Sequence, residues 1–85
     1  MRLTILYFAW VRERIGQGEE VVTVPSDLAT VADLIDWLAS RGGGYAEALA
    51  EPQRLRAAID QDFVGIEAPL AGAREVAIFP PVTGG

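Results

Sequence analysis

The first residues of the chain alternate in a way that predicts a β-strand with two apolar faces. Along residues 2–8 the side chains fall on two sides in turn: Leu3, Ile5 and Tyr7 on one, and Thr4, Leu6 and Phe8 on the other. A strand that is apolar on both faces belongs in the middle of a sheet or under a partner. We therefore expect this strand to lie centrally, or to have its second face covered by another protein.

Around residues 30–40 the apolar spacing changes from two to that of a helix. Four apolar residues recur at i, i+3, i+4 and i+7, on one helical face: Val31, Leu34, Ile35 and Leu38. Thr30 followed by Asp33 resembles a capping box, with Asp in place of the usual Glu or Gln. The glycine run 42–44 predicts a left-handed stop at the end of this main helix.

Shorter apolar runs complete the predicted order of elements. Further strands are expected at 20–24, 55–59, 63–66 and 75–79, and short helical segments at 9–15 and 45–50. This order favours an α+β roll with a mixed sheet of about five strands, in which the first and last strands pair in parallel at the centre. The main helix would cover the sheet face that carries Leu3, Ile5, Tyr7, Val76 and Ile78. We expect residues 1–85 to form a single domain with a flexible C-terminal tail at 80–85.

The opposite sheet face is predicted to carry an apolar patch made of Leu6, Phe8 and Phe79, joined by Phe63. Monomeric proteins seldom expose a large patch of this kind, so it is a candidate binding surface. The alternative is that loops, or Trp10 and the short helix, fold over it.

Composition and charge exclude several classes of function. The net charge is −5, and the seven basic residues, all arginine, form no cluster, which disfavours nucleic-acid binding. The acidic surface suits a basic or mixed-charge protein partner, or serves only solubility. No apolar run approaches the roughly 20 residues that cross a bilayer, and we expect no membrane association and a cytoplasmic location.

The chain offers few side chains for catalysis, because it contains no Cys, His or Lys. Thiol and amine nucleophiles, the commonest general base and the soft metal ligands are therefore missing. Asp60 and Asp62 are too few oxygen ligands for a calcium loop, so we expect no metal site. The glycine run 42–44 follows a helix, whereas phosphate-binding loops precede one.

The C-terminal end has a different character. Pro80 and Pro81 are followed by Val82, Thr83, Gly84 and Gly85, and an extended run from Pro81 could reach roughly 17 Å beyond the fold. Two glycines without Cβ atoms allow the backbone to enter a narrow channel in another protein. Because a terminal carboxylate is ionised at neutral pH and is a poor electrophile, it must be activated to react. The alternative is a tail that simply frays.

These features together resemble the MoaD-type sulfur carrier family, the small subunits of molybdopterin synthase. The resemblance spans most of the chain and is strongest in the ending Glu75-Val76-Ala77-Ile78-Phe79-Pro80-Pro81-Val82-Thr83-Gly84-Gly85, with support from Leu6-Tyr7-Phe8-Ala9, Arg12-Glu13, Thr30-Val31 and Ala57-Ala58-Ile59-Asp60-Gln61. Asp60 departs from the family, which commonly has Asn there.

The resemblance implies a ubiquitin-like β-grasp fold and a chemical role for the C-terminus, with Gly84 and Gly85 as the reacting end. An ATP-dependent, E1-like activating enzyme would adenylate the Gly85 carboxylate, and a sulfur donor would convert it to a thiocarboxylate. The thiocarboxylate would then give sulfur to cyclic pyranopterin monophosphate in the active site of the large subunit of a heterotetrameric synthase. By this resemblance the chain itself would bind no cofactor, and the activating enzyme would use ATP.

By the same resemblance, Phe8, Phe63 and Phe79 would dock on the large subunit and on the activating enzyme in turn, with Pro80, Pro81, Val82 and Thr83 contributing to partner binding. Three alternatives stay open: a carrier for thiamin thiazole synthesis, a ubiquitin-like protein modifier, and an interaction module with an inert tail.

Overall fold

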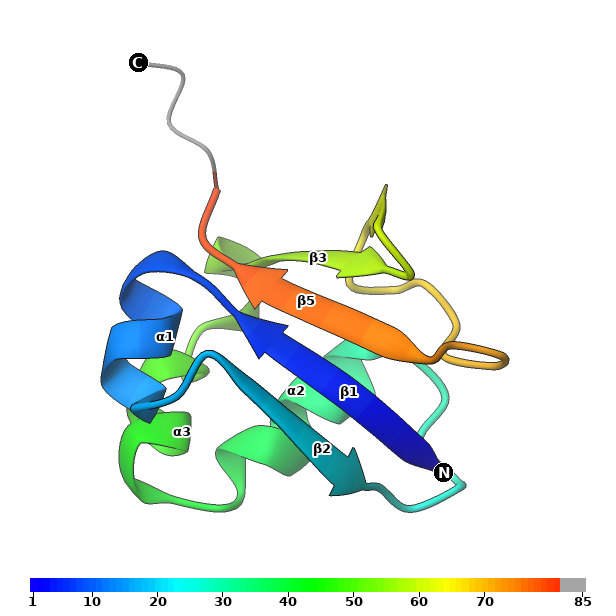
Figure 1. Cartoon of the computed structure of the whole chain (residues 1–85), viewed down its shortest axis with the longest axis horizontal. Helices are drawn as coiled ribbons and strands as arrows, with labels where there is room; N and C mark the ends of the chain where they lie inside the picture. The colour runs from blue at the N-terminus through cyan, green and yellow to red at the C-terminus, as the bar shows by residue number, and fades with distance from the viewer. Residues whose placement is uncertain (82–85) are drawn as a thin grey trace.

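Five strands form one mixed sheet in the order β2-β1-β5-β3-β4 (Figure 1). The computed structural model describes residues 1–81 of the chain. The strands are β1 (Arg2–Tyr7), β2 (Glu19–Thr23), β3 (Arg56–Ile59), β4 (Asp62–Val64) and β5 (Glu75–Phe79). β1 and β5 pair in parallel at the centre, in a register that places Ile5 opposite Val76, and the other pairs are antiparallel. The predicted central pairing of the first and last strands is confirmed.

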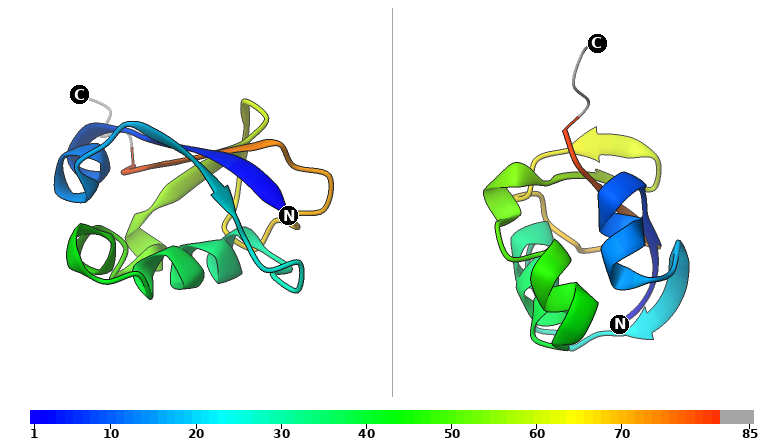
Figure 2. Two further views of the ribbon diagram at one scale, coloured as in Figure 1. Left: turned by 60° about the horizontal axis from the view of Figure 1, so that its bottom comes forward. Right: turned by 90° about the vertical axis from the view of Figure 1, so that its left-hand side faces the viewer.

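Helices cover one face of this sheet (Figure 2). They are α1 (Ala9–Ile15), α2 (Val31–Ala39) and α3 (Gly43–Ala48), and a short 3-10 turn, η1 (Pro52–Arg54), precedes β3. The predicted capping box of α2 is present: the Asp33 N–H donates to Thr30 Oγ1 at 3.2 Å, and the Thr30 N–H donates to Asp33 Oδ2 at 3.2 Å. None of the helices within residues 1–81 has the length and apolar character needed to span a membrane.

The core lies between the sheet and α2, on the face predicted from the sequence. All five predicted sheet residues are buried, and so are the four apolar residues of α2: Leu3, Ile5, Tyr7, Val76, Ile78, Val31, Leu34, Ile35 and Leu38. Burial of each large side chain contributes about 1.5–3 kcal/mol, so this layer supplies most of the driving force for folding.

The interpretation of the glycine run as a helix stop is wrong. α2 ends at Ala39, and its C-cap Ser40 is right-handed, with φ −65°. Gly42, with φ 78°, is the N-cap of α3, and Gly43 and Gly44 lie inside that helix, which begins two residues earlier than predicted. A close approach explains Gly44: a Cβ there would lie 2.0 Å from the Arg14 carbonyl oxygen, so α3 packs on the end of α1 only without a side chain.

Candidate docking groove and the start of the C-terminal segment

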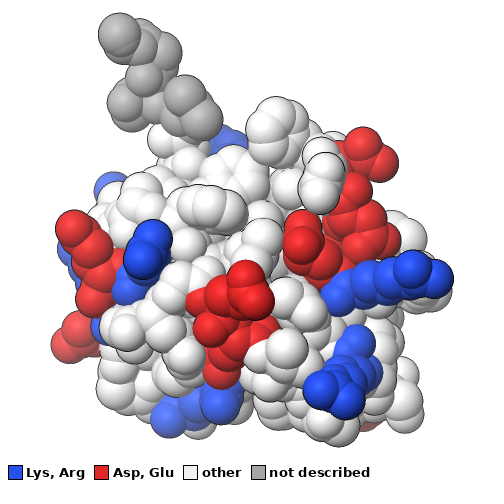
Figure 3. Space-filling model, in the orientation of Figure 1, with Lys and Arg blue, Asp and Glu red and all other residues white. Residues whose placement is uncertain are grey.

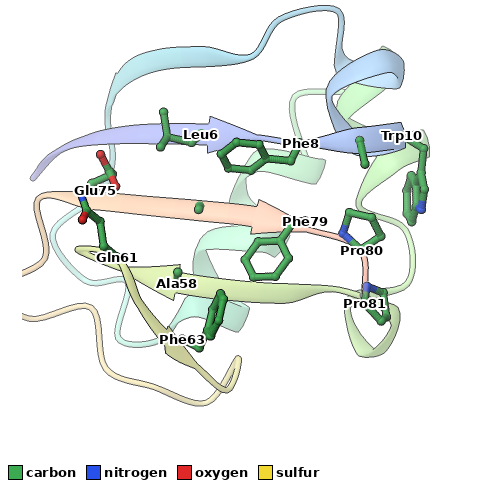
Figure 4. Close-up of a pocket in the computed structure, with 12 residues that line it drawn as sticks. Leu6, Phe8, Trp10, Ala58, Gln61, Phe63, Glu75, Phe79, Pro80 and Pro81 are labelled. Atoms are coloured by element: carbon green, nitrogen blue, oxygen red, sulfur yellow. The ribbon is translucent and has the colours of Figure 1, made fainter. Parts of the chain in front are cut away.

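The uncovered face of the sheet carries an apolar groove of about 850 Å³ (Figure 4). Its lining comes from β1, α1, β3, β4, β5 and the segment after β5, and consists of Leu6, Phe8, Ala9, Trp10, Ala58, Gln61, Phe63, Glu75, Ala77, Phe79, Pro80 and Pro81. Gln61 and Glu75 lie at one end, and Trp10, Pro80 and Pro81 lie at the other. The groove therefore runs along the sheet to the point where the C-terminal segment begins.

Small residues form the floor of the groove and aromatic residues form its walls. Ala58 and Ala77 are directly paired across β3 and β5, and both are buried. Phe63 and Phe79 stand beside them with ring centroids 5.7 Å apart and planes inclined by 55°. Phe63 is 84% exposed and Phe8 is 48% exposed. Large apolar side chains held this far out of the core are what a partner protein buries on binding.

A tight hairpin holds Phe63 in place. Asp60 and Gln61 join β3 to β4 with positive φ angles of 48° and 75°, the backbone that a two-residue turn of this handedness requires. Asp60 Oδ1 also accepts hydrogen bonds from the Arg74 and Glu75 N–H groups, at 3.1 and 2.9 Å. The carboxylate thus ties the hairpin to the start of β5, a task that one amide oxygen of Asn could also perform.

Residues without charge surround the start of the C-terminal segment (Figure 3). On the face shown, they fill its upper part, down to an acidic group near the centre, and further acidic and basic side chains lie on either side. An apolar area bordered by charged residues is typical of docking surfaces.

A polar cluster on the covered side of the sheet holds the edge strand β2 against β1 and α3. Glu20 Oε2 accepts hydrogen bonds from the hydroxyls of Tyr7 and Tyr45, each at 2.7 Å, and Glu20 Oε1 lies 3.1 Å from Arg41 Nη1. Burial opposes ionisation of Glu20, but the hydrogen bonds from Tyr45, Tyr7 and Arg41 outweigh it and lower its pKa. Burial and the neighbouring carboxylate raise the pKa of Tyr7. The cluster joins β1, β2 and α3, and it lies outside the groove.

The structure brings together six of the residues singled out from the sequence: Leu6, Phe8, Phe63, Phe79, Pro80 and Pro81 all line the groove. The other four, Val82, Thr83, Gly84 and Gly85, lie outside the described residues. The patch is not folded over by Trp10, which lines one end of the groove instead. Sequence reasoning missed the alanine floor, although the alternation that placed Phe79 on this face also places Ala77 there.

A mixed sheet with a parallel central pair, backed by a helix and open on its other face, defines a ubiquitin-like protein of the β-grasp fold. The model of the ThiS family matches residues 5–85. Two relatives, each named "Molybdopterin synthase sulfur carrier subunit", come from Escherichia coli K12 and Haemophilus influenzae Rd. They are 41% and 39% identical over 83 residues, which cover 98% of this chain and 99% of each relative.

The crystal structure of SAMP1 from Haloferax volcanii superimposes over the full length of both chains, with a TM-score of 0.71 and 26% identity. The chain belongs to the ThiS family, and the resemblance predicted from its sequence is confirmed.

Proposed function

We propose that this chain is the sulfur carrier subunit of a molybdopterin synthase and that the carboxylate of Gly85 carries the sulfur. The observation that supports this most is the junction between the groove and the chain end: Pro80 and Pro81 line one end of an exposed apolar groove, and the sequence continues for four residues to Gly84-Gly85. Relatives that match nearly the whole chain bear the name of this subunit.

The chemistry requires activation first. The Gly85 carboxylate attacks the α-phosphorus of ATP on the activating enzyme, which releases pyrophosphate and leaves an acyl adenylate. A sulfur nucleophile, written here as hydrosulfide, then attacks the acyl carbon and expels AMP, which leaves a thiocarboxylate. The chain supplies no thiol of its own, because it contains no cysteine.

In the second stage the thiocarboxylate end enters the active site of the large subunit. Its anionic sulfur is a soft nucleophile and attacks a carbon of cyclic pyranopterin monophosphate. The new C–S bond forms as a C–O bond at that carbon breaks and its oxygen leaves, so an acyl thioester joins the carrier to the pterin and the dithiolene is begun. Water then cleaves the acyl carbon–sulfur bond, which returns the Gly85 carboxylate and leaves the sulfur on the pterin. The large subunit supplies the side chains that bind substrate and move protons, since this chain has neither His, Cys nor Lys.

The groove would serve both partners in turn. Phe8, Phe63 and Phe79 provide the exposed apolar contacts, and docking there places the C-terminal segment in a partner's active site. Because one surface serves the large subunit and the activating enzyme, their binding should be mutually exclusive.

Reconstitution of the synthase tests this proposal. Deletion of Gly85, or addition of one residue after it, should abolish sulfur transfer to the pterin precursor while docking on the large subunit is preserved, because the reacting group is misplaced and the groove is untouched. Retained transfer in either variant would refute the role of the chain end. A protein modifier would instead form covalent conjugates with lysines of other proteins.

A further inference from the structure

The hydrogen-bonded pairing that holds β5 in the sheet ends at Phe79. The β3–β5 register ends with Arg56 opposite Phe79, and neither Pro80 nor Pro81 has an N–H group to donate to another hydrogen bond. The direction in which the chain continues is therefore set by the stiff proline backbone and by the side chains that lie beside it.

Trp10 is the aromatic residue at the end of the groove where the two prolines lie. Its indole ring lines the groove at the end where Pro80 and Pro81 lie (Figure 4). The side chain is half-buried and packs against the core. On α1, the guanidinium carbon of Arg14, one turn later, lies 4.8 Å from the ring centroid of Trp10, within the range of a cation–π contact. The ring is thus held by both the core and Arg14.

The backbone that leads to Trp10 is unusual. Ala9, between β1 and Trp10, has a φ of 54°, a left-handed conformation that residues with a Cβ seldom adopt. Strained backbone of this kind persists where the surrounding structure requires a particular placement, and it gathers at functional sites. Here it turns the first residues of α1 so that Ala9 and Trp10 both line the groove.

We propose that Trp10 is a positioning residue: its ring, held by Arg14, forms a wall beside Pro80 and Pro81 that restricts the directions in which the Gly85 carboxylate is presented to the activating enzyme. The inference rests on the proposed function and extends it. Docking uses the phenylalanines of the groove, whereas Trp10 acts on the geometry of the reacting end after docking.

The chain contains a matched control. Trp37 on α2 is also half-buried and also has an arginine one turn later, with the Arg41 guanidinium carbon 5.8 Å from its ring centroid, but it does not line the groove. The experiment compares Trp10→Ala, Trp10→Phe, Arg14→Met and Trp37→Ala with the wild-type chain. The rate at which the carrier's acyl adenylate forms is measured with ATP and the cognate activating enzyme, over a range of carrier concentrations.

For Trp10→Ala we expect kcat to fall about tenfold while KM for the carrier stays within about twofold, because misplacement affects the bound reactant and not its binding. Trp10→Phe should recover most of the rate, and Trp37→Ala should match the wild type. Arg14→Met, at an exposed position, should lower kcat by about threefold. If Trp10→Ala does not fold, the decrease of kcat in Arg14→Met tests the inference in its place.

Nuclear magnetic resonance relaxation at the Pro81 α-carbon gives a second readout that needs no enzyme. Fast motion there should increase in Trp10→Ala and stay at the wild-type level in Trp37→Ala. An unchanged kcat, a change confined to KM, or equal Pro81 motion in both alanine variants would overturn the inference. If the wild-type chain itself is never adenylated, the proposed function fails. That failure can be told apart from failure of the Trp10 inference, because the relaxation measurement at Pro81 still reports on Trp10.

Discussion

Among substitutions in the groove, Phe63→Ala should give the clearest loss of affinity for a partner with the smallest loss of folding stability. In the free protein the Phe63 side chain is 84% exposed, so it contributes little to the core, and its main contact is with the ring of Phe79. Removal of the ring should change the free energy of unfolding by less than about 1 kcal/mol, because little buried area is lost.

The expected effect on binding is much larger. Full burial of a phenylalanine side chain is worth about 2–3 kcal/mol, and most of that area is still exposed in the free chain. If the large subunit covers Phe63, Phe63→Ala should raise Kd by about 20- to 100-fold, since each 1.4 kcal/mol is a factor of ten.

Isothermal titration of the purified large subunit with the carrier measures this change, and thermal unfolding measures stability. Val21→Ala is the control: Val21 is 52% exposed on β2 but does not line the groove. An unchanged Kd for Phe63→Ala, or an equal change for Val21→Ala, would contradict the assignment of the groove as the docking surface.

Three further predictions concern docking, packing and pH. Phe79→Arg places a charge at the centre of the groove and should weaken binding to both the large subunit and the activating enzyme with the fold intact; pull-down of both partners at wild-type levels would disprove this. Gly44→Ala should destabilise the fold by about 1–3 kcal/mol in urea unfolding, because its Cβ would overlap the Arg14 carbonyl oxygen, which outweighs the better helix propensity of alanine. Since the folded pKa of Glu20 lies below its ordinary 4.5, its ionised form contributes stability that is present above pH 4.5 and is lost as the pH falls further. Glu20→Gln should accordingly lose less stability than the wild type between neutral pH and pH 3, and parallel losses would argue against the cluster.

Local patterns predicted most of the fold. The two apolar faces of residues 2–8 placed β1 at the centre, where it pairs with both β2 and β5. The i, i+3, i+4, i+7 pattern identified the buried face of α2. The short helical segment predicted at 9–15 matches α1, which ends at the left-handed Gly16. Each of these features depends on residues close together in the sequence.

What the sequence did not reveal depends on contacts between distant residues. Nothing near Gly44 indicates that Arg14, thirty positions earlier, approaches its α-carbon, so the local sequence alone favours a helix cap at the glycine run. The hydrogen bonds of Glu20 with Tyr7 and Tyr45 also join segments that only the tertiary fold brings together. In the candidate site, alternation placed the phenylalanines on one face, but the place of Trp10 follows from the left-handed turn at Ala9, which no residue type there signals.

The central claim is that the last carboxylate of the chain carries sulfur, and the mass of the protein tests it most directly. After incubation with the activating enzyme, ATP and sulfide, the intact chain should gain the mass that corresponds to replacement of one oxygen by sulfur, and fragmentation should locate the change at Gly85. A chain without Gly85 should show no such gain. An unchanged mass in the wild-type chain, with an activating enzyme proven competent on another carrier, would contradict the account.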